Sequence, residues 1–440
     1  MKIFVLKASL FILLALSFET HAEVLGVYKT PTGTGWLERS SQGDLILHLE
    51  GSYYDMGYEH AMLLRKETGA ALRSLKYALY HRIPFLPTSW VIAALDELVY
   101  RKQEPFIPNE FKDEMRGLSD AGGVSLRLIH AAHALTYLTS CAGIAAWGSA
   151  TRDGELYFGR SNDAFVTIDP QTKKSFHDLG MIVTYKPVNS IPYMMISWPG
   201  YIGASDGMNA EGIALCNMSD PSKHETPAGV PMIFRLKQTL AKSHNLKEAI
   251  NWITEKPLEG GYNFILTDAK IPSAAVTEMD AMNVYVGNWD GPAESNRYIY
   301  KREEYRYTPS RDLLLRTNHP LSSDLIASHK NKIDDDRRNW LTWPRFRDLR
   351  ERLIKQYGSL DLESMNEILR SHYQGMNYSD KATLGATTHQ FVMKPKTGDF
   401  LVAFCKGNPL ELGRKKVGAF NQPVHRYNFF DLLNSKPEQY

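Results

Sequence analysis

The chain has 440 residues, of which 43% are hydrophobic and 23% are charged, and its formal net charge is +2. This composition is ordinary for a soluble globular protein, and a near-neutral charge without a basic cluster argues against nucleic-acid binding. The length suits two or three average domains, or one large enzyme domain with a helical extension.

The first 22 residues have the pattern of a secretion signal. Lys2 and Lys7 supply positive charge, residues 8–18 are apolar, and residues 20–22 (THA) end in a small residue. We expect cleavage after Ala22 and a secreted or periplasmic protein. The apolar run is too short to span a bilayer comfortably, so an uncleaved anchor is the weaker alternative. No later apolar run reaches about 18 residues, so stable membrane insertion is not expected.

Residues 23–140 are predicted to form a mainly helical pro-segment. Residues 23–45 read as extended, and residues 45–50 (LILHLE) alternate like a short strand. Apolar spacing and Gly-type stop signals then predict a series of helices, at 58–79, 90–101, 110–120 and 125–138.

The pattern changes to strands at Cys141. Residues 141–147 are apolar, Asp153-Gly154 is a hairpin-turn signal, and residues 156–160 form the returning strand. Further strands are predicted at 181–185, 193–198, 212–218, 262–267, 274–278, 283–287, 388–394 and 399–404. Helices are predicted at 231–242, 246–255, 343–356 and 362–372. Antiparallel hairpins with flanking helices indicate a layered α+β enzyme.

Three cysteines occur, and their positions differ in character. Their wide spacing excludes a disulfide scaffold, and without CxxC or HExxH we expect no structural metal and no cofactor. Cys216 and Cys405 lie in apolar strand patterns and are predicted to be small buried hydrophobes. Cys141 instead opens a strand directly after Thr139-Ser140, at the boundary between the helical half and the β half.

The residues around Cys141 resemble a known family. Residues 141–151 (CAGIAAWGSAT), followed by Asp153-Gly154 and residues 159–163 (GRSND), are similar to the start of the mature chain in the penicillin acyltransferase-like autoproteolytic hydrolases. These are relatives of choloylglycine hydrolase, penicillin V acylase and acid ceramidase. Four more motifs match in chain order, at 51–57 (GSYYDMG), 207–212 (GMNAEG), 317–320 (TNHP) and 387–388 (TT). This sequence departs from the family at Ala142-Gly143, where many relatives carry Thr-Ser.

The resemblance implies a four-layer αββα N-terminal-nucleophile (Ntn) hydrolase sandwich of antiparallel sheets over 141–440. It also implies a precursor that cuts itself between Ser140 and Cys141, after which the two fragments stay associated. A free cysteine needs a base to attack well, and the freed α-amine, with a pKa of about 8, can be that base. The expected reaction is hydrolysis of a linear amide through a thioester on Cys141, with acyl transfer left open.

Two further residues are placed near Cys141 by the hairpin itself. Residues about 19 to 22 positions along a hairpin return beside its start, which brings back Arg160 and Asp163. Arg160 would favour the thiolate, and Asp163 would hold the terminal amine. The alternative is an ordinary surface ion pair at a hairpin end.

Three more residues receive roles from the resemblance. Asn318 would donate its side-chain amide to the oxyanion, Asn217 would help from its backbone or side chain, and Arg345 would steady the site's loops. Asn217 could instead be a strand-end turn residue, as Asn209 is expected to be. Arg345 could lie on a solvated helix face. A papain-like pairing of the cysteine with a histidine is disfavoured for His319 and His389, because the local signature is absent.

The substrate class stays open between several readings. The aromatic-rich stretch before Cys141 could wall an acyl pocket for a small-molecule or lipid-like N-acyl substrate, its candidates being Tyr77, Tyr80, Phe85, Leu86 and Trp90. A phospholipase B-like ester hydrolase and a catalytically inactive secreted lipid-binding relative are the alternatives. A dipeptidase of the related cysteine class fits less well with so long a pro-segment.

Overall fold

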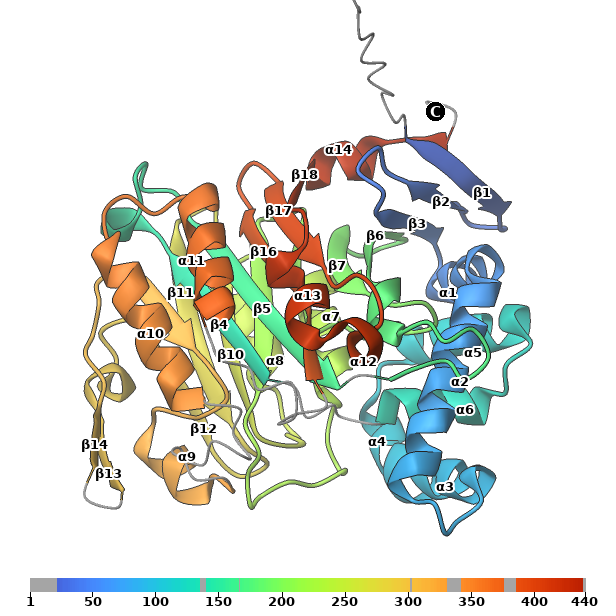
Figure 1. Cartoon of the computed structure of the whole chain (residues 1–440), viewed down its shortest axis with the longest axis horizontal. Helices are drawn as coiled ribbons and strands as arrows, with labels where there is room; N and C mark the ends of the chain where they lie inside the picture. The colour runs from blue at the N-terminus through green and yellow to red at the C-terminus, as the bar shows by residue number, and fades with distance from the viewer. Residues whose placement is uncertain are drawn as a thin grey trace, which may run out of the picture.

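The computed structural model describes residues 22–134, 140–165, 167–300, 303–330, 342–375 and 385–437. The signal peptide predicted up to Ala22 lies outside these ranges except for its last residue, and so does the end of the helix predicted over 125–138. Within them, two sheets lie face to face and helices cover the outer side of each (Figure 1).

The larger sheet joins strands that precede Cys141 to strands that follow it. Its order is β1 (Glu23–Lys29), β2 (Thr34–Arg39), β3 (Leu45–Gly51), β6 (Met181–Pro187), β7 (Tyr193–Ser197), β8 (Asp206–Asn209), β9 (Ile213–Ser219), β10 (Tyr262–Asp268), β11 (Ser273–Met279) and β12 (Val284–Gly287). Neighbouring strands are antiparallel except β3 and β6, which run parallel through seven paired residues. The predicted pro-segment therefore supplies three strands as well as helices.

The smaller sheet carries the strand that begins near Cys141. Its order is β15 (Leu313–Arg316), β4 (Ser140–Ala146), β5 (Tyr157–Phe165), β16 (Gly385–Lys394), β17 (Asp399–Phe404) and β18 (His425–Asn428), all antiparallel. A separate hairpin is formed by β13 (Arg297–Tyr300) and β14 (Glu303–Arg306).

Apolar side chains fill the space between the sheets, among them Phe158, Met194, Ile265, Phe391 and Val402. Helices α7 (Met232–Lys242) and α8 (Leu246–Thr254) pack on the larger sheet, and α10 (Thr342–Lys355) and α11 (Leu362–Gly375) on the smaller one. Every residue of β10 is buried, because a strand inside such a sandwich is covered on both faces. The four-layer αββα arrangement is thus confirmed.

The pro-segment helices differ in detail from the prediction. The helix expected over 58–79 is two helices, α1 (Tyr53–Leu63) and α2 (Arg65–Arg82), because Leu64 leaves the helical conformation at φ −123°. Next come α3 (Thr88–Leu95), a π-helical turn at Asp96–Tyr100, α4 (Arg101–Gln103), α5 (Asn109–Gly122) and α6 (Leu126–Ala134). Within the described part of the chain, no helix has the length and apolar character needed to cross a bilayer.

The aromatic residues suggested as pocket walls lie on the surface of this helical segment. Phe85 is 81% exposed and Trp90 is 67% exposed, and Tyr77, Tyr80 and Leu86 are exposed as well. These residues therefore form a surface of the helical segment, and their part in an acyl pocket stays a prediction.

Short elements complete the fold. They are α9 (Ser323–Ser328), α12 (Pro409–Leu412), α13 (Arg414–Val417) and α14 (Phe429–Asn434). The Asp-Gly signal proved to be part of a longer connection, since residues 147–156 separate β4 from β5 and include a 3-10 turn at Gly148–Ala150.

Candidate active site

Cys141 is a fully buried residue near the start of β4, and the sheet register sets its neighbours. Across the β4–β5 pair, Cys141 lies opposite Asn162, Ser140 opposite Asp163, and Gly143 opposite Arg160. The expectation that the returning strand brings Arg160 and Asp163 beside Cys141 is confirmed.

The thiol of Cys141 faces a buried guanidinium. Nη2 of Arg160 donates to Cys141 Sγ at 3.2 Å and to Asn162 Oδ1 at 3.0 Å, and the thiol itself donates to that Oδ1 at 3.2 Å. Arg160 is 0% exposed, so the surface ion-pair interpretation is wrong. A cation in this position favours the thiolate over the thiol.

The other side of the Arg160 guanidinium is neutralised by an acid that the sequence analysis did not single out. Nη1 of Arg160 lies 2.9 Å from Asp206 Oδ2, and that oxygen also contacts His389 Nε2 at 2.9 Å. Burial on its own would raise the pKa of Asp206, but His389 and Arg160 together lower it below its ordinary value. Asp206 therefore stays ionised and holds Arg160 in place.

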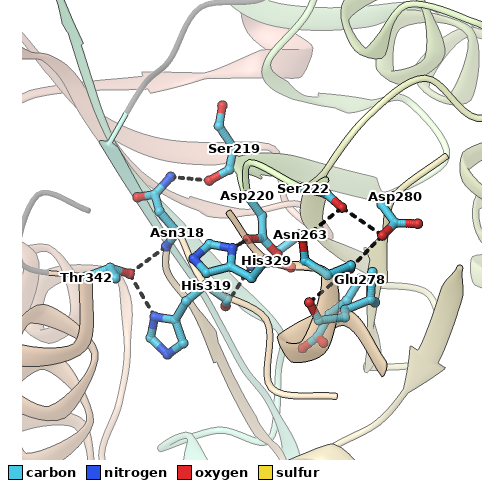
Figure 2. Close-up of polar contacts among 12 residues, drawn as sticks. Ser219, Asp220, Ser222, Asn263, Glu278, Asp280, Asn318, His319, His329 and Thr342 are labelled. Atoms are coloured by element: carbon cyan, nitrogen blue, oxygen red, sulfur yellow. Dashed lines mark hydrogen bonds and ion pairs between the residues drawn. The ribbon is translucent and has the colours of Figure 1, made fainter. Parts of the chain in front are cut away.

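The backbone nitrogen of Cys141 is held by Asn318. The Cys141 N–H donates to Asn318 Oδ1 at 2.6 Å, and Arg345 Nη2 donates to the same oxygen at 2.6 Å. The Asn318 amide nitrogen donates to the Ser219 carbonyl at 2.7 Å (Figure 2). Two donors on one side and a carbonyl on the other settle which amide atom is oxygen. Asn318 thus contacts Cys141 as an acceptor here, whereas we expected it to be an oxyanion donor.

Asp163 anchors Arg345 rather than standing alone beside Cys141. Thr387 Oγ1 donates to Asp163 Oδ1 at 2.6 Å, and Arg345 Nη1 lies 3.7 Å from Oδ2. Burial raises the pKa of Asp163 to about 6, while Arg345, Thr387 and Arg160 act in the opposite direction. Arg345 is 0% exposed on α10, so its interpretation as a solvated residue is wrong.

Asn217 lies in the middle of β9, so its interpretation as a strand-end turn residue is also wrong. Its side-chain oxygen accepts from Arg160 Nη1 at 3.4 Å, and its N–H donates to the Ser205 carbonyl at 3.1 Å. Asn209 is the turn residue that we expected. Its Oδ1 accepts two backbone N–H groups, at Glu211 and Ile213.

Both candidate histidines are engaged with other groups. His319 Nδ1 lies 2.8 Å from the Thr342 hydroxyl, and burial holds the pKa of His319 well below its ordinary value. His389 contacts Asp206 and, at 3.2 Å, Thr388. Neither ring is placed as a base for Cys141 by these contacts.

The other two cysteines are buried, as predicted, and neither takes part in a disulfide. Burial raises the pKa of Cys216 to about 12 and that of Cys405 to about 12, which makes both poor nucleophiles. Cys216 also explains the glycine at 143, since a Cβ there would lie 2.7 Å from Cys216 Sγ.

The sequence matches one protein-family model over residues 150–408, more than half of the chain. This is the family described as acyl-coenzyme A:6-aminopenicillanic acid acyl-transferase. An uncharacterized protein of Archaeoglobus fulgidus is 23% identical over 375 residues, covering 76% of this chain and 59% of that protein. Protein dcd1B of Dictyostelium discoideum is 26% identical over 235 residues, covering 48% of this chain and 45% of that protein. The chain therefore spans about half the length of these curated relatives.

The chain is also similar to solved structures of other proteins. A Caenorhabditis elegans N-acylethanolamine-hydrolyzing acid amidase ortholog is 16% identical with a TM-score of 0.39, and the match covers 65% of this chain and 100% of that one. Penicillin V acylase from Agrobacterium tumefaciens is 13% identical with a TM-score of 0.41, and the match covers 66% of this chain and 88% of that one.

Proposed function

Since this chain belongs to the acyl-coenzyme A:6-aminopenicillanic acid acyl-transferase family, we propose that it is a self-activating cysteine hydrolase of linear N-acyl amides. The observation that carries the proposal is the double restraint on Cys141. Its sulfur lies 3.2 Å from a buried guanidinium and its nitrogen 2.6 Å from the Asn318 oxygen. In a nucleophile and base that belong to one residue, the guanidinium would stabilise the thiolate and the Asn318 oxygen would orient the amine.

The first step is a cut between Ser140 and Cys141. The thiol adds to the Ser140 carbonyl carbon, its proton passes to the Cys141 nitrogen, and the C–N bond breaks to leave a thioester. Water then hydrolyses the thioester, which restores the thiol and leaves Ser140 with a carboxylate. The Cys141 nitrogen is not basic while it is conjugated with the Ser140 carbonyl, and after the cut it is a free amine with a pKa of about 8.

The same residues then act on the substrate in the second reaction. The amine takes the thiol proton, the thiolate attacks the acyl carbonyl, and the protonated leaving amine departs to give an acyl thioester that water hydrolyses. Arg160 stabilises the thiolate, and Asp163 and Arg345 fix the charge balance around the amine. Asn318 accepts a hydrogen bond from that amine through its Oδ1, and the side-chain amide of Asn217 is the proposed donor to the oxyanion. A free amine that outcompetes water would give acyl transfer instead.

The fold supports continued association of the two fragments after the cut. Strand β3 precedes the cut and pairs with β6, which follows it, over seven residues. Lys237 Nζ donates to Glu114 Oε2 at 2.5 Å across the same division, and both side chains are 0% exposed. We therefore propose that the mature enzyme is a tight complex of residues 23–140 and 141–440.

The signal-like start supports export as part of the proposal. The protein would be secreted or periplasmic, with a mature N-terminus at Glu23. Fractionation with N-terminal sequencing tests this, and an N-terminus that begins at Met1 in the cytosol would contradict it.

Denaturing electrophoresis, intact mass and N-terminal sequencing test the cut. We expect two fragments from the wild-type protein, with one beginning Cys-Ala-Gly-Ile, and a single chain from Cys141→Ala. Wild-type protein that stays in one piece while remaining active would contradict the mechanism.

Substrate class is tested with purified protein and a panel of fatty N-acyl amides, bile-acid conjugates, penicillin V and a matched fatty ester. Release of free acid from an amide, absent in Cys141→Ala, is the expected result. Hydrolysis of the ester with no turnover of any amide would favour the ester-hydrolase alternative.

A further inference from the structure

Asn318, which holds the Cys141 nitrogen, is itself fixed through its backbone. The Asn318 N–H donates to the Thr342 hydroxyl at 2.9 Å (Figure 2). The carbonyls on either side of it, at Thr317 and His319, accept the two N–H groups of Asn263 at 3.0 and 2.9 Å. Asn263 is 0% exposed within β10. One side-chain amide thus binds the carbonyl groups of the two residues that flank Asn318.

The side chain of Asn318 is fixed through a second set of contacts. The Asn318 side-chain amide donates to the Ser219 carbonyl. The N–H of the same peptide group, which belongs to Asp220, donates to the Gly261 carbonyl at 2.9 Å. The Asp220 carboxylate lies 2.5 Å from His329 Nδ1, and the two side chains are 3% and 5% exposed. The peptide group that receives Asn318 is therefore held by backbone on one side and by a buried pair on the other.

The backbone of His329 is itself paired, as in a β-sheet, with the segment that follows Ser219. Ser222 and His329 form an antiparallel bridge, flanked by hydrogen bonds of 2.8 Å from Lys330 to the Pro221 carbonyl and from Lys223 to the Ser328 carbonyl.

Two other acids face Asp220, and both have partners of their own. Glu278 pairs with Arg316 at 2.8 Å, and Asp280 accepts from Ser222 and contacts His224 at 3.0 Å. Burial raises the pKa of Asp220, and the negative charges of Glu278 and Asp280 raise it further, whereas His329 acts to lower it. His329 is thus the side chain that pairs with Asp220.

We propose that Asn263 and the Asp220–His329 pair are positioning residues, which hold Asn318 and through it the Cys141 nitrogen. The proposal rests on the function proposed for Cys141. The nitrogen must keep one place as a peptide nitrogen during the cut and as an amine during turnover. A displacement of about 1 Å in such a group slows a reaction by up to about a hundredfold.

Two variants test the proposal, each with a matched control. Asn263→Leu removes both N–H donors, and its control is Thr267→Val. Thr267 lies on the same strand, is equally buried, and makes two hydrogen bonds to the backbone of Ala214. His329→Gln removes the imidazole that faces Asp220 but keeps a similar volume. Its control is His224→Gln, which breaks the neighbouring pair with Asp280.

We expect Asn263→Leu and His329→Gln to slow the self-cleavage and to lower kcat by about ten- to a hundredfold, with KM changed less than about twofold. The controls lose thermal stability to a similar degree but keep both rates. The double variant is slowed by less than the product of the single effects, because both changes act on Asn318. Equal slowing in variants and controls would overturn the proposal. If Asn263→Leu does not fold, His329→Gln decides.

A second measurement does not depend on the chemistry. Hydrogen exchange of the Asn318 backbone N–H should be faster in Asn263→Leu and in His329→Gln than in either control at matched stability. Unchanged exchange rejects the positioning role even if the enzyme is active. Wild-type protein that is neither cut nor active would reject the proposed function, and the exchange data would still show whether these residues hold Asn318.

Discussion

At the scale of single residues, the site depends on two buried arginines that each have an acidic partner. Arg160 faces the thiol and pairs with Asp206, while Arg345 reaches the Asn318 oxygen and lies near Asp163. A buried cation without an anion would be costly. The acids therefore allow two positive charges to stand beside one cysteine without solvent.

A pH dependence follows from Asp163. Burial raises the pKa of this carboxyl to about 6, so its charge is lost below that pH. We expect kcat/KM to rise with pH through about 6, because the ionised carboxylate balances Arg345 and the terminal amine. Asp163→Asn should remove this rise and lower the plateau by about ten- to a hundredfold, the value of a hydrogen bond to a charged group. A pH–rate profile for both proteins checks the prediction.

The ionisation of Asp163 has the opposite effect on folding stability, which falls as pH rises through the range in which kcat/KM rises. Unfolded, this carboxyl ionises near its ordinary pKa of 3.8, whereas in the folded protein it keeps its proton up to about 6. Between these values the unfolded state has lost a proton that the folded state retains, so this group lowers stability as pH rises. Urea unfolding at several pH values should show a smaller decline for Asp163→Asn. A profile identical to wild type in both assays would contradict the assignment.

At the scale of elements, the motif at 51–57 receives a structural explanation. Ser52 caps α1 by accepting the Asp55 N–H, and Gly57 lies where α1 crosses α5. A Cβ at position 57 would lie 2.0 Å from the Glu114 carbonyl oxygen, and one at Gly117 2.0 Å from the Tyr54 carbonyl oxygen. The glycines therefore set the distance between the two helices.

Gly57→Ala should destabilise the protein by about 1–3 kcal/mol, the usual cost of overpacking. Its control is Gly69→Ala in α2, where the nearest atom is the movable end of Arg73 at 3.3 Å. That change should be neutral or stabilising by up to about 1 kcal/mol, because alanine favours the helix. Urea midpoints compare the two, and equal midpoints would refute the close-crossing argument.

At the scale of the whole molecule, residues 23–140 are built into the same sheet and core as the rest of the chain. Their strands extend the larger sheet, and their helix α5 sends Glu114 to Lys237 of α7 in the core. Lys237 also donates to the Ile202 carbonyl at 2.8 Å and lies 4.3 Å from the ring centre of Tyr185. Burial lowers the pKa of Lys237 to about 8. The pair thus links segments on both sides of the proposed cut.

Lys237→Met should cost about 3–5 kcal/mol, because it leaves Glu114 buried without its partner. The double variant Glu114→Leu/Lys237→Met should recover most of that loss, since both charges are then gone. Urea unfolding of the cut protein, followed by the separation of its fragments on a sizing column, measures the effect. Equal loss in the single and double variants would show that the pair is not the link.

The sequence by itself determined those features that depend on local pattern. The apolar run at 141–147, the Asp153-Gly154 turn signal and the strand at 156–160 predicted an antiparallel pair. Such a pair returns residues about 19 to 22 positions later beside its start, which placed Arg160 and Asp163 near Cys141. Apolar spacing likewise predicted the helices α7, α8, α10 and α11 within a residue or a few. These signals are local because each strand or helix exposes its own periodicity.

Only the tertiary structure decided which distant groups meet. Asp206 reached Arg160, the Ser219 carbonyl reached Asn318, and β3 paired parallel with β6 across more than a hundred residues. It also decided that Arg345 is buried and that Phe85 is exposed. The local periodicity of a sequence predicts which side of a helix or strand is apolar. The partner that covers that side is selected by the packing of the whole chain, because burial and charge pairing are properties of the assembled core.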